Sequence, residues 1–172
     1  MGGIQRLKRT VKAFSGIKAR AGWFSSAKYT NEGVPVARVA MWQEFGTRKI
    51  TPRPFVRPTI LEKSGEWLDI TRKGINSVFN GRNTAMGVMT VLAQRVAADV
   101  RVTISEIRTP PISPVTHLLR EWRRQGIEIN QTEVWRAINA VKKGVRASGG
   151  NDQPLNDTGH MITTLTGIAV KK

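Results

Sequence analysis

The sequence predicts a helix-rich α+β fold, and two observations lead to that prediction. Long stretches have apolar residues at the three- and four-residue spacing of a helix that buries one face. Two short apolar stretches, residues 17–24 and 165–170, are instead typical of strands, and the first of them alternates loosely. At 172 residues the chain is expected to form a single domain, residues 1–172, that can bury a core.

Charge is the most pronounced global feature of the chain. Twenty-eight Lys and Arg against twelve Asp and Glu give a net charge of +16, which favours an acidic partner such as nucleic acid, an acidic protein surface or anionic lipid. Without a helix-turn-helix, zinc-finger or RNA-binding signature, non-specific contact with DNA phosphates or an acidic neighbour is favoured over sequence reading. The chain has no cysteine, which excludes disulfides and thiolate metal sites, and no apolar run long enough to predict a membrane span.

The first elements are short. Residues 4–14 predict a basic amphipathic helix, and we expect it to pack its apolar side on the rest of the chain. A membrane-surface helix would look similar but is usually longer. Ile17–Phe24 predicts a strand, and residues 25–35 a loop or hairpin with Asn31-Glu-Gly as its turn.

Residues 36–59 predict a short helix, a stop and a proline-braced turn. Apolar residues recur at helical spacing in Val36–Phe45, and Gly46 is the expected C-cap because glycine takes a left-handed conformation without steric cost. In the following Pro52-Arg-Pro-Phe-Val-Arg-Pro, each proline fixes its own φ and favours an extended residue before it. We therefore expect Arg53 and Arg57 to project from a stiff, extended segment.

Two long helices are expected next, at residues 58–80 and 84–107. Asn83-Thr84 would cap the second, whose apolar residues come close to a seven-residue repeat. That repeat fits a coiled-coil seam, a helix packed on a sheet, or a contact with a neighbouring subunit.

Residues 109–150 predict a helical insertion, followed by a flexible linker over residues 147–154. Its first helix, Val115–Gln125, would be capped by Ser113 or Thr116. Its second helix, Thr132–Val145, would turn Trp135 inward. The first helix should expose three arginines, which are a candidate contact with an acidic partner or simply a solvated face: Arg120, Arg123 and Arg124.

The search for chemistry gives no site. Asp157-Thr-Gly matches the tripeptide of aspartic proteases, but its flanking residues do not, and we expect Asp157 or Thr158 to cap a short helix. His117 and His160 are far apart, and there is no nucleophile elbow, Walker loop, zinc-ligand spacing or compact acidic cluster for magnesium. The prediction is a non-enzyme with no catalytic residue, metal or cofactor.

The tryptophans lie within apolar patterns, which favours packing in the core or at a subunit interface over stacking on single-stranded nucleic acid. They are Trp23, Trp42, Trp67, Trp122 and Trp135.

Two motifs carry a resemblance. Gln43-Glu-Phe-Gly-Thr followed by Pro52-Arg-Pro-Phe-Val-Arg-Pro resembles a pattern of small neck and tail-completion proteins of long-tailed bacteriophages. The ending from Pro154 to Leu165 is similar to the leucine, aspartate, threonine-glycine, short-helix and strand ending of that family, although His160 and Met161 stand where leucine and arginine are common. The first motif includes or adjoins Trp42, Glu44, Phe45, Gly46, Arg53, Pro54, Phe55 and Arg57.

The resemblance implies a small antiparallel sheet packed by long helices, with residues 165–170 pairing in the same sheet as residues 17–24. It implies a ring-forming subunit, expected to be a hexamer, in the virion neck after assembly in the host cytoplasm. The ring would complete the tail and join head to tail. Its partners would be the head connector or stopper and the tail terminator or tube. The motif residues are then expected to shape the subunit core and a neighbour contact.

Other functions stay open at this point. A tail terminator or minor tail protein would share the ring and the mixed fold, and the ring could also touch packaged DNA non-specifically. The alternative from another class is a basic nucleic-acid-binding accessory protein.

Overall fold

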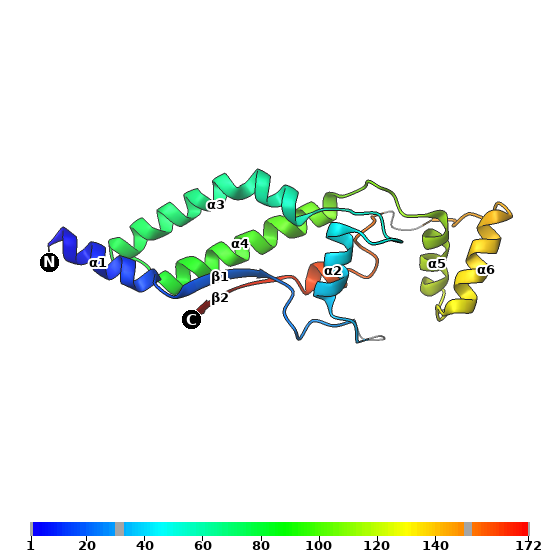
Figure 1. Cartoon of the computed structure of the whole chain (residues 1–172), viewed down its shortest axis with the longest axis horizontal. Helices are drawn as coiled ribbons and strands as arrows, with labels where there is room; N and C mark the ends of the chain where they lie inside the picture. Colours follow the sequence, from blue (N-terminus) through cyan, green and yellow to red (C-terminus); the bar gives the residue numbers. More distant parts are fainter. Residues whose placement is uncertain (1, 30–32, 150–152, 172) are drawn as a thin grey trace.

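The computed structural model describes residues 2–29, 33–149 and 153–171, and over these residues the chain forms seven helices and one two-stranded sheet (Figure 1). This confirms the predicted α+β class. The molecule is elongated, with helix α3, helix α4 and the sheet lying along one another (Figure 1). The predicted turn at residues 31–33 lies largely outside the described residues.

The sheet joins the two ends of the chain, as expected. Strand β1 (Ile17–Gly22) pairs antiparallel with β2 (Thr166–Lys171) over their whole length. Helix α4 (Ala85–Glu106) packs on it, and its buried residues there include Ala93 and Ala97. A Cβ on Gly167 would overlap the backbone of Ala93, so strand and helix meet backbone to backbone. Of the alternatives for α4, packing on a sheet is the one observed.

Helix α3 (Val56–Phe79) runs alongside α4. Thr84 caps α4 as predicted, because its hydroxyl accepts a hydrogen bond from the backbone N–H of Gly87 at 3.1 Å. Between the two helices, the indole N–H of Trp67 donates to the buried carboxylate of Asp99 at 2.7 Å. This bond satisfies a carboxylate that faces inward from α4.

The hydrophobic core lies where the segments of the two sequence motifs meet. Helix α2 (Val36–Phe45), the turn after it, the C-terminal half of α4 and the short helix α7 (His160–Thr163) surround it. Phe55 is fully buried, and the ring of Trp23 meets it edge to face at 5.9 Å. Trp23 also donates its indole N–H to the carbonyl of Met161 at 2.7 Å. The core residues are Val36, Ala40, Phe55, Ala97, Val100, Ile104, Leu155, Met161 and Leu165.

Helices α5 (Pro114–Arg124) and α6 (Gln131–Lys142) pack on each other at the end of the molecule away from the sheet (Figure 1). The Ser113 hydroxyl caps α5, as predicted. The inward position predicted for Trp135 is wrong: Trp135 is exposed, and Ala137 is the fully buried residue of α6. Helices α5 and α6 lie so close together that only a small side chain such as that of Ala137 fits at their contact.

Helix α1 (Gly3–Phe14) has the predicted length but not the predicted orientation. Its apolar residues Ile4, Leu7 and Val11 are exposed, and Thr10 is its buried residue. The Thr10 hydroxyl donates to the carbonyl of Arg6 at 2.9 Å, which satisfies it in a buried position. The expected packing of the apolar side is therefore wrong for a single copy of the chain. Amphipathicity identifies a face suited to burial but not what covers it.

None of the described helices is both long and apolar enough to cross a membrane.

Candidate functional site

The carboxylate of Glu44 organises the first motif. Glu44 stands at the end of α2 and is buried, with only 4% of its surface exposed. Its Oε2 accepts the backbone N–H groups of Phe55 at 2.6 Å and Val56 at 2.9 Å, and its Oε1 accepts that of Arg57 at 3.2 Å. These are the first N–H groups of α3, which have no partner within the helix. One side chain of α2 thus caps the next helix from outside it.

Charge favours the same arrangement. Burial alone would raise the pKa of Glu44, but the N–H donors of Val56 and Phe55 and the guanidinium of Arg57 outweigh it and hold this pKa below its ordinary value. The positive end of the α3 dipole also favours an anion here. Glu44 is therefore a carboxylate at neutral pH, and its capping bonds are charge-assisted.

Arg57 closes the site from the surface. Its Nε donates to Glu44 Oε1 at 3.0 Å, its Nη2 donates to the Glu44 carbonyl at 3.1 Å, and its guanidinium lies 5.0 Å from the ring centroid of Phe45. Arg57 belongs to the first turn of α3, so the prediction that it projects from an extended segment is wrong. The helix begins earlier than predicted because Glu44 supplies acceptors that the local sequence lacks.

Arg53 ties the same turn to the start of the α5–α6 region. Its Nε donates to the carbonyl of Pro110 at 2.8 Å and its Nη2 to that of Pro111 at 3.0 Å. Its backbone N–H donates to the carbonyl of Gln43 at 2.7 Å. Both arginines of the motif therefore make bonds within the chain.

Gly46 makes the turn possible. It ends α2 at φ 74°, the positive φ expected of the C-cap. A Cβ here would lie 2.9 Å from both the Ile50 carbonyl oxygen and Pro52 Cδ, so the site excludes a side chain for lack of space as well.

The motif is thus an internal brace with an exposed apolar edge. Phe55 is buried, Trp42 is half-buried, and Pro54 is exposed. Phe45 and Met41 are also exposed, on the outer side of α2. The expectation that these residues shape the subunit core fits Glu44 and Phe55, whereas the neighbour contact stays a prediction.

The three arginines predicted to be exposed on α5 do not form one surface. Arg120 is buried, at 8% exposed, and donates to the carbonyls of Gln153 at 3.0 Å and Pro154 at 3.1 Å. Its exposure was predicted wrongly, because the C-terminal segment folds back over it. Arg123 and Arg124 are exposed, so of the three only these two remain candidates for contact with an acidic partner.

Asp157 also has a different role from the predicted cap. It pairs with Arg120 at 3.3 Å and with Arg123 at 2.6 Å, while Gly159 stands at the N-cap position of α7. Asp157 therefore links the C-terminal motif to α5. The neighbouring His160 ring lies on Tyr29 and contacts the Lys28 carbonyl at 2.9 Å.

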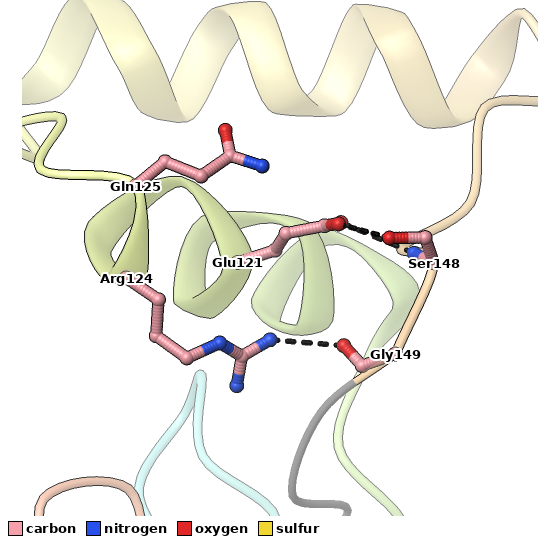
Figure 2. Close-up of a pocket in the computed structure, with 5 residues that line it drawn as sticks. All are labelled: Glu121, Arg124, Gln125, Ser148 and Gly149. Carbon is pink, nitrogen blue, oxygen red and sulfur yellow. Dashed lines mark hydrogen bonds between the residues drawn. The ribbon is translucent and has the colours of Figure 1, made fainter.

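A polar hollow of about 430 Å³ lies between α5 and the segment after α6 (Figure 2). The Ser148 hydroxyl bonds the Glu121 carboxylate there, and Arg124 donates to the Gly149 carbonyl at 2.9 Å. The bonds from Ser148 hold the pKa of Glu121 below its ordinary value. Both charged side chains thus bond the segment after α6, so these contacts tether that segment to α5.

Across residues 2–29, 33–149 and 153–171, no group of three or more His, Asp or Glu side chains is placed to hold a metal ion.

Sequence reasoning missed two polar residues of the interior. Thr59 is buried, and its hydroxyl lies 2.7 Å from that of Thr103, which joins α3 to α4 next to the Glu44 cap. Asp99 holds Trp67, and Arg95 donates to it at 3.0 Å. A carboxylate between the apolar residues of α4 was the available signal, since a buried charge needs a partner.

Comparison of the chain with protein-family models, with curated proteins and with solved structures finds no match.

Proposed function

We propose that this chain is a structural subunit of the bacteriophage neck, a tail-completion or head-to-tail joining protein. Copies would form a ring, expected to be a hexamer, between the head connector or stopper and the tail terminator or tube. The two motifs that resemble the neck family support this proposal, together with an α+β fold in which those motifs share one core.

The observation that carries the proposal is the number of large apolar side chains left in water. Leu61 of α3 is 83% exposed, and Leu68 and Ile75 of the same helix are exposed as well. Helix α1 exposes Ile4, Leu7 and Val11, and α2 exposes Met41 and Phe45. Exposed apolar faces on several helices are typical of a chain that forms protein interfaces. A ring subunit flanked by other copies and by the next layer of the neck would bury these faces.

The brace around Glu44 suits such a subunit. By capping α3 from α2, it fixes the exposed edge of α2 relative to the long helices. A rigid relation between two interface elements reduces the entropy lost on assembly. The charge of +16 would steer the subunit towards acidic neighbours and could also bring the ring lumen into contact with packaged DNA.

The same charge favours the second candidate, a nucleic-acid-binding accessory protein. Its specific support is α1, where Arg6, Lys8, Arg9 and Lys12 occur without any acidic residue. The two functions predict different behaviour of the purified chain. A DNA-binding protein should bind duplex DNA with an affinity that falls steeply as salt rises.

Gradient sedimentation with and without DNA separates the two. The neck proposal predicts oligomers that form in the absence of DNA as the chain concentration rises, and that persist in high salt. A chain that stays monomeric alone and sediments faster only with DNA, in a salt-dependent way, would contradict the neck proposal and support the accessory protein.

A further inference from the structure

Helix α1 leaves most of its apolar face exposed in its own copy. Ile4, Leu7, Val11 and Phe14 follow the alternating three- and four-residue spacing of a helix that packs on another helix. The first three are 74%, 56% and 64% exposed. The side of α1 that carries Thr10 already packs on the body of the molecule, so these three residues point elsewhere.

The body of the molecule has a groove that suits the apolar face of α1. An open groove of about 420 Å³ runs between β1, α3 and α4, with Leu68 and Thr71 on one wall and Ala19 and Ala21 on the other. Leu92 and Val96 of α4 also line it. The lining is mostly apolar or small, which suits aliphatic side chains and a closely approaching helix.

The exposed stripe of α3 extends the groove in both directions. Leu61, Leu68 and Ile75 occur at seven-residue intervals, so they lie in one row along the helix. The row is about 21 Å long at 1.5 Å per residue, and α1, with its twelve residues, is about 18 Å long. Donor helix and acceptor row are therefore of similar length.

Exposed carboxylates on α3 favour docking of the basic helix α1 there. Copies with a net charge of +16 repel each other, and α1 contributes four of the positive charges. Helix α3 carries Glu62, Glu66 and Asp69, with Glu62 and Asp69 largely exposed. Their present ion pairs are at the surface, where such pairs are weak and can exchange partners. Helix α3 has three acidic and four basic residues, so an incoming basic helix would meet exposed carboxylates on a helix of low net charge.

We propose that α1 of one copy docks in the groove formed by β1, α3 and α4 of a second copy. Donor and acceptor are different surfaces of the chain, so every copy can give one helix and receive another. A head-to-tail contact of this kind closes into a ring or continues as a filament. The proposal rests on the self-association that the proposed function requires, and it names the surfaces that would carry it.

Cysteine cross-linking between copies tests the contact directly. The chain has no cysteine of its own, so introduced thiols report one pair at a time. Copies with Leu7→Cys and a size tag are mixed with untagged copies carrying Leu68→Cys and oxidised mildly. The matched control replaces Leu7→Cys by Lys12→Cys, which stands on the polar side of α1. The expected result is a tagged–untagged dimer several-fold more abundant for the Leu7 pair than for the control pair.

A second variant reports on assembly without any cross-link. Leu7 is exposed, so Leu7→Ala should fold normally but weaken self-association about tenfold, as expected for truncation of an interface anchor. Lys12→Ala is its control: it removes one surface charge from the polar side of α1 and should change sedimentation much less than Leu7→Ala. Equal sedimentation of Leu7→Ala and wild type would contradict the proposal.

Other outcomes would overturn the contact in distinguishable ways. If the chain forms oligomers but the cysteines at positions 7 and 68 do not cross-link, this contact surface is refuted and the neck function still stands. A cross-link found only within one chain, in a Leu7→Cys, Leu68→Cys double variant, would show that α1 folds onto its own groove. A monomeric chain whose α1 binds anionic vesicles would make α1 a membrane-surface helix. The neck function itself fails separately, if virions assemble normally without the protein.

Discussion

Replacing Glu44 by alanine removes the cap of α3 from a distance and is the sharpest test of the brace. Three backbone N–H groups lose their acceptor, and that of Phe55 is left buried. Loss of a helix cap costs about 0.5–2 kcal/mol, and an unsatisfied buried donor costs about 1–3 kcal/mol. We count nothing for the ion pair with Arg57, because that side chain is more than half exposed and is screened by solvent.

The expected loss of unfolding free energy is therefore about 2–4 kcal/mol. For a domain of this size the melting temperature should fall by roughly 5–15 °C. Urea unfolding of the wild type and Glu44→Ala, followed by circular dichroism at equal chain concentration, measures the difference. Glu62→Ala is the control, because Glu62 is exposed and pairs only at the surface, and it should unfold close to the wild type. Equal unfolding midpoints for Glu44→Ala and Glu62→Ala would refute the capping role.

Three further predictions concern the Glu44 cap, the turn at Gly46 and the contact between β2 and α4. The pKa of Glu44 is lower in the folded chain than in the unfolded chain, where glutamate titrates at about 4.3. The contribution of Glu44 to stability is therefore complete above that pH and is lost as the pH falls through the folded pKa. The gap between the urea midpoints of wild type and E44Q should be the same at pH 7 and pH 5 and smaller at pH 3, and an undiminished gap at pH 3 would argue against it. Gly46→Ala should lower the free energy of unfolding by about 1–3 kcal/mol. The control is Gly81→Ala, where φ is similar but the space around the glycine is open, and it should cost less in parallel urea titrations. Equal losses would show that the lack of space at the Gly46 turn does not matter. Gly167→Ala should destabilise the fold by about 1–3 kcal/mol, because the added Cβ would push β2 away from α4. Gly65→Ala, on the open side of α3, should instead stabilise the fold by about 0.5–1 kcal/mol. Thermal melts that rank the two variants in the opposite order would contradict the packing described.

Local signals predicted much of the fold. The helix Val36–Phe45 and its glycine stop follow from spacing and from the special conformation of Gly46, both of which are properties of neighbouring residues. The caps at Thr84 and Ser113 are local in the same sense. The pairing of the two terminal strands is not local, and it was expected only through the resemblance to a family.

The parts that sequence reasoning missed depend on residues that meet only in the folded chain. Nothing near Glu44 in sequence shows that its carboxylate will accept N–H groups of the following helix. Arg120 was expected outside because the helix pattern cannot show the C-terminal segment that covers it. In both cases a polar side chain is buried because distant backbone groups satisfy it.

Helix α1 shows the opposite error. Its pattern predicts an apolar face suited to burial, and the single chain leaves that face in water. The spacing of apolar residues indicates that a helix face is suited to burial, but it does not indicate whether the surface that covers it belongs to the same copy. Exposed residues on α1 and α3 are what make an assembly function the leading proposal.

The most direct test of the central claim is electron microscopy of particles made by a phage whose copy of this gene carries an early stop codon. The neck function predicts DNA-filled heads lying beside unattached tails of normal length, with joining restored when the protein is supplied from a plasmid. Overlong or missing tails would move the protein to the terminator or the tail shaft. Complete, infectious virions in the absence of the protein would contradict the account.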